Sequence, residues 1–134
     1  MQATTLRHAT LLLICTVLTA CAALKDRTDL LEQTQRDYEG AVRWGHYDSA
    51  YAMHRNADGS VPTPESRLNN YKVTGYQVLS RSVAKDEASA DQVVAIKYYH
   101  VDYLRESTLT LQQHWRYDAP TRSWLVTSPP PDFN

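Results

Sequence analysis

Three side chains that could perform acid–base chemistry alternate along one predicted strand: Tyr98, His100 and Asp102. Because side chains two residues apart in a strand point to the same face, we expect all three to project together. An imidazole or carboxylate poised near neutral pH could transfer a proton, and a tyrosine hydroxyl could stabilise an oxyanion. In the alternative interpretation, Tyr98 packs against a helix, His100 lies at the rim of the core and Asp102 begins a turn.

The histidines that follow residue 21 are not spaced as metal ligands. They are His46, His54, His100 and His114. None forms an H-x-x-x-H or H-x-H pair, and no cysteine follows Cys21 to join them. The sequence also has no phosphate-binding loop and no dinucleotide fingerprint. We therefore expect neither a metal nor a cofactor.

The other candidate for function is a surplus of aromatic side chains. The chain has nine tyrosines and three tryptophans but one phenylalanine. Such side chains fill a core while their polar atoms reach water or a partner. A surplus that lines a cleft or an exposed sheet face would suit a peptide, a glycan strand or a lipid. The residues that we assign to such a binding surface are Trp44, Tyr47, Tyr51, Tyr99 and Tyr103; the alternative for each is a place in the core.

Residues 1–20 have the form of a secretory signal peptide. Arg7 and His8 precede an uncharged run, Ala9 to Ala20, which is shorter than the ~20 residues that a membrane-spanning helix needs. The run ends in Leu18-Thr19-Ala20-Cys21, and this motif resembles the lipobox of bacterial lipoproteins. A positive start, a short apolar run and small residues before the cut site are typical of such a leader.

The resemblance to lipoproteins implies a role for Cys21. Its thiol receives a diacylglyceryl group, and its amine is acylated after cleavage, palmitate being a typical acyl chain. Ala22 follows instead of Asp, which favours the outer membrane and a domain that faces the periplasm. Cys15 is discarded with the leader, so the mature chain has no disulfide. The alternative is an ordinary cleaved signal that leaves Cys21 as a free thiol.

Composition limits what the mature chain can bind. The formal net charge of the whole chain is −1, and Arg7 is the only charged residue before residue 21, so the mature chain is slightly more acidic. Nucleic-acid binding needs a basic stripe, and we expect none. After a tether of residues 21–25, residues 26–134 suit a single domain.

Helical periodicity dominates the first part of this domain, in the stretch "DRTDLLEQTQRDYEGAVRWGHYD". We expect Asp29 to cap the start of the helix and Gly45 to end it in a left-handed conformation. Gly40 inside the helix predicts a close contact with another segment. Asp48 is predicted to cap a short second helix, residues 49–55, and one helical turn is expected after Pro64. The side chains predicted to face the core are Leu31, Tyr38 and Val42.

From residue 71 the apolar pattern changes to a period of two, which predicts an antiparallel sheet. The expected strands are residues 71–83, 90–104, 107–118 and 122–128. We expect a bulge at Gly75. A tight hairpin with Tyr117 and Arg122 as its closing pair would place Trp115 opposite Trp124.

Two helices followed by a meander predict an α+β fold, in which a long N-terminal helix and a short helix pack on a curved four-stranded antiparallel sheet. Two stretches, "YEGAVRWGHYDSAYAM" and "QQHWRYDAPTRSWLV", resemble the nuclear-transport-factor-2-like, or cystatin-like, superfamily in their order. The resemblance covers residues 26–128. It implies a cone in which, in enzymes of the superfamily, Asp, His and Tyr transfer protons. The chain also resembles small bacterial lipoproteins that end in a hairpin and a proline–aromatic tail, here Pro131-Asp132-Phe133.

We therefore expect a lipid-anchored periplasmic domain that acts as a non-catalytic binding or assembly module of the cell envelope. One alternative is a small isomerase- or dehydratase-like enzyme that uses Tyr98, His100 and Asp102 in a polar cavity. Another is a purely structural envelope lipoprotein. The expected partners are the membrane, through the lipid on Cys21, and an envelope protein, a peptide or the cell-wall polymer. Similar domains often pair as homodimers.

Overall fold

The structure is a computed structural model, and it describes residues 26–134. The predicted leader, residues 1–20, and the predicted tether, residues 21–25, lie outside the described residues. Within residues 26–134, no helix is both long and apolar enough to cross a bilayer.

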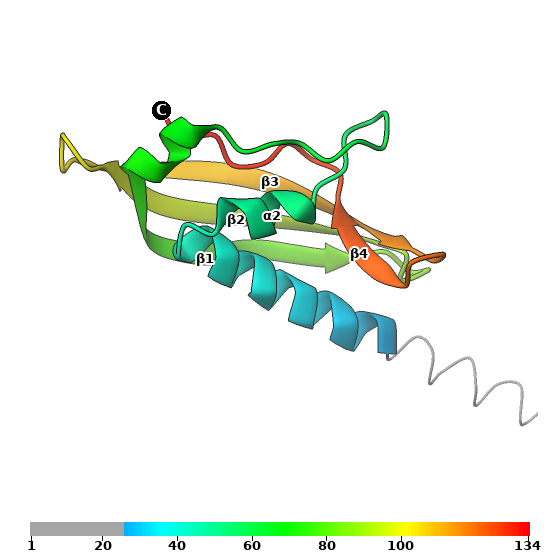
Figure 1. Ribbon diagram of the computed structural model, residues 1–134. Helices are drawn as coiled ribbons and strands as arrows, with labels where there is room; N and C mark the ends of the chain where they lie inside the picture. Colours follow the sequence, from blue (N-terminus) through cyan, green and yellow to red (C-terminus); the bar gives the residue numbers. More distant parts are fainter. Residues whose placement is uncertain (1–25) are drawn as a thin grey trace, which may run out of the picture.

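Four antiparallel strands form one open sheet (Figure 1). They are β1 (Tyr71–Val83), β2 (Ser89–His100), β3 (Glu106–Asp118) and β4 (Ser123–Val126). Each strand pairs with the next one in the sequence, so β1 and β4 are the edges. Helices pack on this sheet, and the predicted α+β class is confirmed. A one-turn 3-10 helix, η1 (Ser66–Asn70), also confirms the helical turn expected after Pro64.

The predicted bounds of the first strand are confirmed, but the second strand ends four residues earlier than expected. The backbone N–H groups of Tyr103 and Leu104 both donate to the carbonyl of His100, at 3.1 Å. Leu104 has a φ of +49° in this turn. The chain therefore turns directly after His100, and the residues from 101 on leave the strand.

The edge strand β1 is bulged at two places. Its pairing with β2 is interrupted between Val73 and Gly75, where the sequence predicted a bulge, and again between Val78 and Ser80. Bulges twist an edge strand and make it a poor template for further strand pairing.

The residues from 26 to 43 form a helix that lies against one face of the sheet (Figure 1). Its buried side chains include Leu31, Tyr38 and Val42, as the periodicity predicted. Tyr38 packs edge-on against Trp115 of β3, with the ring centroids 5.5 Å apart. The opposite side of the helix carries i,i+4 ion pairs such as Arg43–Glu39, at 3.3 Å.

Both predicted helix caps are wrong. Asp29 lies inside the helix, which is already formed at residue 26. The second helix, α2 (Tyr47–Ala52), has His46 at its N-cap, and Asp48 lies within its first turn. Gly45 ends the preceding helix with a φ of +72°, as expected. The N–H of His46 reaches back to the carbonyl of Ala41, at 2.8 Å, and this Schellman-type closure starts α2 two residues early.

The register of the last hairpin also differs from the prediction. Tyr117 lies opposite Trp124, and Trp115 lies opposite Val126. The reason is a turn that lies one residue later in the chain: Asp118 pairs with Ser123, and Arg122 takes a φ of +52° and therefore leaves the strand. Tyr117 and Trp124 form the aromatic pair, with centroids 5.4 Å apart, while Trp115 is free to meet Tyr38.

His54 joins the helix, the segment after α2 and the C-terminal segment. Its Nδ1 lies 2.9 Å from the carbonyl oxygen of Ser128, and its Nε2 lies 2.9 Å from the hydroxyl of Tyr38. A carbonyl only accepts, so Nδ1 carries the proton, and Nε2 accepts the Tyr38 hydroxyl. His54 also forms an isolated parallel bridge with Val126 of β4. Burial lowers the pKa of His54 and raises that of Tyr38, so both stay neutral.

A matched pair of glycine variants tests the helix end. Among residues 26–134, no atom outside Gly40's own helix turn lies within 4 Å of a Cβ built at this position, contrary to the close contact expected there. Gly40→Ala should therefore raise the free energy of unfolding by about 0.5–1 kcal/mol. Gly45→Ala should lower it by about 1 kcal/mol, because Ala is strained at a positive φ. Urea denaturation followed by circular dichroism measures both, and a destabilised Gly40→Ala variant would contradict the first expectation.

Acid should destabilise the fold through His54. The unfolded chain takes up a proton near pH 6.5, the ordinary pKa, while burial keeps folded His54 neutral to a lower pH. The unfolded state then binds more protons, so the free energy of unfolding decreases as the pH falls below 6.5. The decrease from one group is at most about 1.4 kcal/mol per pH unit. In a His54→Gln variant, the free energy of unfolding from denaturation curves should decrease less between neutral and acidic pH than in the wild-type protein. His46→Gln, at an exposed position, is the control and should keep the wild-type decrease.

Candidate functional site

The start of the 26–43 helix and the β2–β3 turn lie at opposite ends of the sheet (Figure 1). The hydroxyl of Thr28 donates to Glu87 in the β1–β2 turn, at 3.4 Å, and Trp124 Nε1 donates to the carbonyl of Arg27, at 3.0 Å. The other end, where β1 and β3 begin and β2 finishes, gathers aromatic side chains. We call it the aromatic end.

Phe133 fills the centre of the aromatic end. Its side chain is 0% exposed, and its ring centroid lies 4.7 Å from that of Tyr98, 5.8 Å from Tyr71 and 6.2 Å from Tyr47. We call these three tyrosines the aromatic cage. They come from β2, β1 and α2, so the fold must assemble before the cage exists.

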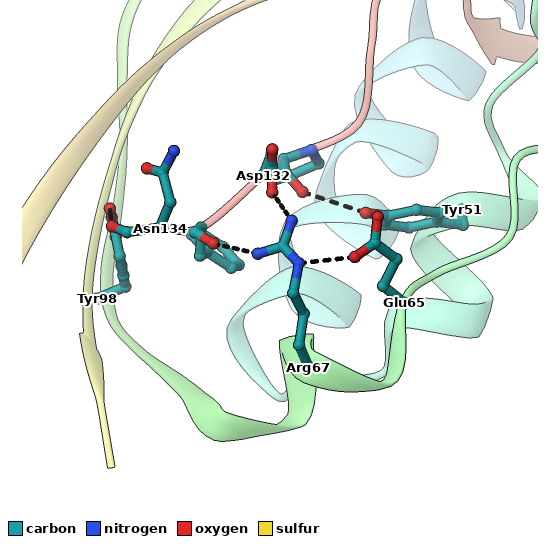
Figure 2. A network of polar contacts seen from close by, with 8 residues as sticks. Tyr51, Glu65, Arg67, Tyr98, Asp132 and Asn134 are labelled. Carbon is teal, nitrogen blue, oxygen red and sulfur yellow. Dashed lines mark hydrogen bonds and ion pairs between the residues drawn. The ribbon is translucent and has the colours of Figure 1, made fainter. Parts of the chain in front are cut away.

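Arg67 of η1 holds the residues around Phe133 (Figure 2). Its Nη1 donates to the carbonyl of Phe133, at 2.6 Å, and its Nη2 pairs with the carboxylate of Asp132. Its Nε donates to Glu65, at 2.7 Å. The hydrogen bonds that Arg67 donates to Asp132 and, second, to Glu65 raise its pKa, so the guanidinium keeps its charge.

Two tyrosine hydroxyls hold the neighbouring carbonyls. Tyr51 donates to Pro131, at 3.2 Å, and Tyr98 donates to Asn134, at 3.0 Å (Figure 2). Burial raises the pKa of Tyr51 and keeps it a donor. Tyr47 has its hydroxyl buried without a hydrogen-bond partner among the described residues, and burial raises its pKa too.

Two hollows flank Tyr71 at the aromatic end. The first has a volume of about 420 Å³, and its lining includes Arg43, Trp44, Asn69, Lys72 and Tyr99. The second has a volume of about 250 Å³, and its lining includes Tyr98, His100, Tyr103, Arg105 and Asn134. Both combine aromatic rings with a cation, a pairing that suits apolar and anionic groups of a ligand.

The three residues of the predicted acid–base site are not enclosed together. The backbone N–H of Asp102 donates to His100 Nδ1, at 3.2 Å, and the Asp102 side chain is 74% exposed. His100 packs between the rings of Tyr71 and Tyr103, and the hydroxyl of Tyr98 donates a hydrogen bond to the carbonyl of Asn134. Because β2 ends at His100, Asp102 lies in the turn, where its exposed carboxylate is 3.7 Å from His100 Nδ1. The arrangement is close to the alternative interpretation, with His100 at the rim and Asp102 in the turn, but Tyr98 packs against Phe133 and Tyr71 and not against a helix.

The five predicted binding residues divide into two groups. Trp44 is 75% exposed and Tyr103 is 77% exposed, while Tyr99 is half-buried beside Trp44 in the first hollow. Tyr47 and Tyr51 are buried and belong to the core and its polar rim. The structure therefore brings Trp44 to the same end of the sheet as Tyr99 and Tyr103, although it lies far from both in the sequence.

Sequence reasoning did not identify Arg67, Asn69, Lys72 and Arg105 as site residues. They are single polar residues in η1, at the start of β1 or in the β2–β3 turn, with no pattern that marks them. Phe133 carried a usable signal, because it is the only phenylalanine and follows a proline run and an acidic residue. Among residues 26–134, no three His, Cys, Asp or Glu side chains gather so that they could hold a metal ion.

No protein-family model matches the chain, and no curated protein or solved structure matches it either.

Proposed function

We propose that this protein is a lipid-anchored lipoprotein of the cell envelope, and that it is a non-catalytic module that binds a partner through its aromatic end. One observation carries the proposal: Trp44 and Tyr103 are about three-quarters exposed beside two hollows at the end of the sheet farthest from residue 26. Exposed aromatic side chains around hollows are typical of binding surfaces.

The position of the proposed anchor supports this use of the aromatic end. The lipid on Cys21 would be separated from residue 26 by a tether of about 15–18 Å when extended. β2 has 12 residues and spans about 40 Å at ~3.3 Å per residue. A domain held at its residue-26 end therefore presents the aromatic end away from the membrane, toward the periplasm.

The charges at the aromatic end indicate the chemistry of the partner. Within residues 26–134, neither Lys72 nor Arg105 forms an ion pair or a side-chain hydrogen bond. Both cations lie beside exposed aromatic rings, although the chain as a whole is slightly acidic. A protein or cell-wall peptide that carries carboxylates and apolar side chains would complement this surface.

The exposed position of Asp102 makes the enzyme alternative the weaker one, since acid–base catalysis needs its groups positioned together and shielded from water.

We also propose that the domain belongs to the nuclear-transport-factor-2-like, or cystatin-like, superfamily. The support is the helix laid against one face of a four-stranded antiparallel meander and the chain's turn from this helix into α2 at Gly45. The bulges of β1 disfavour a homodimer through that edge.

Photo-crosslinking in cells tests the binding surface. A photoreactive amino acid in place of Trp44 or Tyr103 should give discrete crosslinked bands that mass spectrometry assigns to the same partner. The same amino acid in place of Thr110, on the uncovered face of β3, is the control and should give none of these bands. Crosslinks from Thr110 alone, or from no position, would contradict the proposal.

Metabolic labelling tests the anchor. Wild-type protein and a Cys15→Ser variant should both incorporate radiolabelled palmitate in a bacterial host, since Cys15 is removed with the leader. A Cys21→Ser variant should incorporate none, because it has no thiol at the predicted site. Label retained by Cys21→Ser would refute lipidation at this residue.

A further inference from the structure

Residues 129–134 cross the aromatic end as an extended strap, and their contacts resemble those of a bound peptide. The last backbone–backbone hydrogen bond of the described chain is made by Thr127, to His114. Beyond it, the strap is held by the ring of Phe133, the carboxylate of Asp132 and three carbonyl groups, all of which contact side chains of other segments. Three consecutive prolines supply no N–H and favour an extended conformation.

The receiving surface is held together by contacts that do not involve the strap. Glu65 positions the guanidinium of Arg67, at 2.7 Å. Tyr71 and Tyr98 meet edge-on at 5.8 Å, and they project from strands that pair with each other. A pre-organised site of this kind costs little ordering when a ligand enters.

Open volume adjoins the strap at both of its ends. Near Pro129 and Pro130, a groove of about 270 Å³ is lined by Tyr51, Thr63 and Arg67. Beyond Asn134, the hollow of about 250 Å³ continues to Tyr103 and Arg105. A peptide longer than the strap could therefore follow the same path without displacing any strand or helix.

We infer that the aromatic cage and Arg67 form a recognition site for an extended peptide segment of a partner protein, in which an acidic residue directly precedes an aromatic one, and that the strap occupies this site until the partner displaces it. The acidic side chain pairs with Arg67, the aromatic ring enters the cage, and the backbone carbonyls accept from Tyr51, Arg67 and Tyr98. The strap is tethered, so it competes at an effective concentration on the order of millimolar. The partner class deepens the proposed function and rests on it.

Fluorescence anisotropy with the full mature chain in detergent tests this site, with a labelled peptide of residues 128–134 as the probe. A Phe133→Ala variant, whose strap no longer fills the cage, should bind the peptide at least tenfold more tightly than the wild-type chain does. A peptide with alanine in place of either the aspartate or the phenylalanine should bind at least tenfold more weakly. Adding Arg67→Gln to the Phe133→Ala variant should abolish binding, while adding Arg36→Gln, at an exposed arginine of the 26–43 helix that lines neither hollow, should not.

A second variant covers the case in which Phe133→Ala does not fold. A protease site inserted between Ser128 and Pro129 leaves the strap in place until it is cut, and the cut strap should then dissociate and be replaced by the labelled peptide. The inference would be overturned if either protein, with Phe133 replaced or with the strap cut off, is folded by circular dichroism and still fails to bind the peptide. Mixed dimers of labelled and unlabelled wild-type chains in native mass spectrometry would overturn the inference that a partner protein supplies the peptide, since a second copy of the chain would then supply its strap. Peptide binding without crosslinks at Trp44 and Tyr103 would sink the proposed function and leave the site intact.

Discussion

The hydrogen-bonded chain from Tyr38 through His54 to Ser128 is the constraint on which the rest of the structure depends. It joins the middle of the 26–43 helix, the segment after α2 and the exit of β4, three segments that are distant in the sequence. All three groups are neutral, so the junction carries no cost of buried charge. Because Ser128 is fixed here, the following prolines run back along α2 and bring Phe133 to the aromatic cage.

A second set of polar side chains lies between the helix and the sheet and adds specificity to an otherwise apolar core. Gln92 donates to Gln113, at 3.2 Å, and Gln113 donates to the hydroxyl of Tyr76, at 3.0 Å. Burial raises the pKa of Tyr76 to about 12, so it remains a hydroxyl. Such a network is stable only when its members meet in one register, since an unpaired buried amide costs free energy. Gln35 of the helix is that costly case, because both polar atoms of its amide are buried without partners among the described residues.

The two ends of the sheet have different surroundings, and this asymmetry underlies the proposed function. One end is tied to the helix by contacts of Arg27 with Trp124 of β4 and of Thr28 with Glu87 in the β1–β2 turn. The other end collects aromatic rings and the cations of Lys72 and Arg105, and its central cage is filled by the chain's own Phe133. A site filled by a segment that makes no strand pairing combines a stable resting state with an exchangeable occupant, a combination that suits a protein held near its partners by a membrane anchor.

The amino-acid sequence by itself determined the features that depend on neighbouring residues. The bounds of β1, the buried stripe of Leu31, Tyr38 and Val42, the left-handed end at Gly45 and the alternation along β3 all follow from local periodicity and backbone sterics. Only the tertiary structure decided the two-residue shift of the β3–β4 pairing, the end of β2 at His100 and the enclosure of Phe133. It also decided that Arg67 meets Asp132, 65 residues away in the sequence. Contacts between residues so far apart leave no pattern within either segment, because their energy appears only when the whole chain has closed around them.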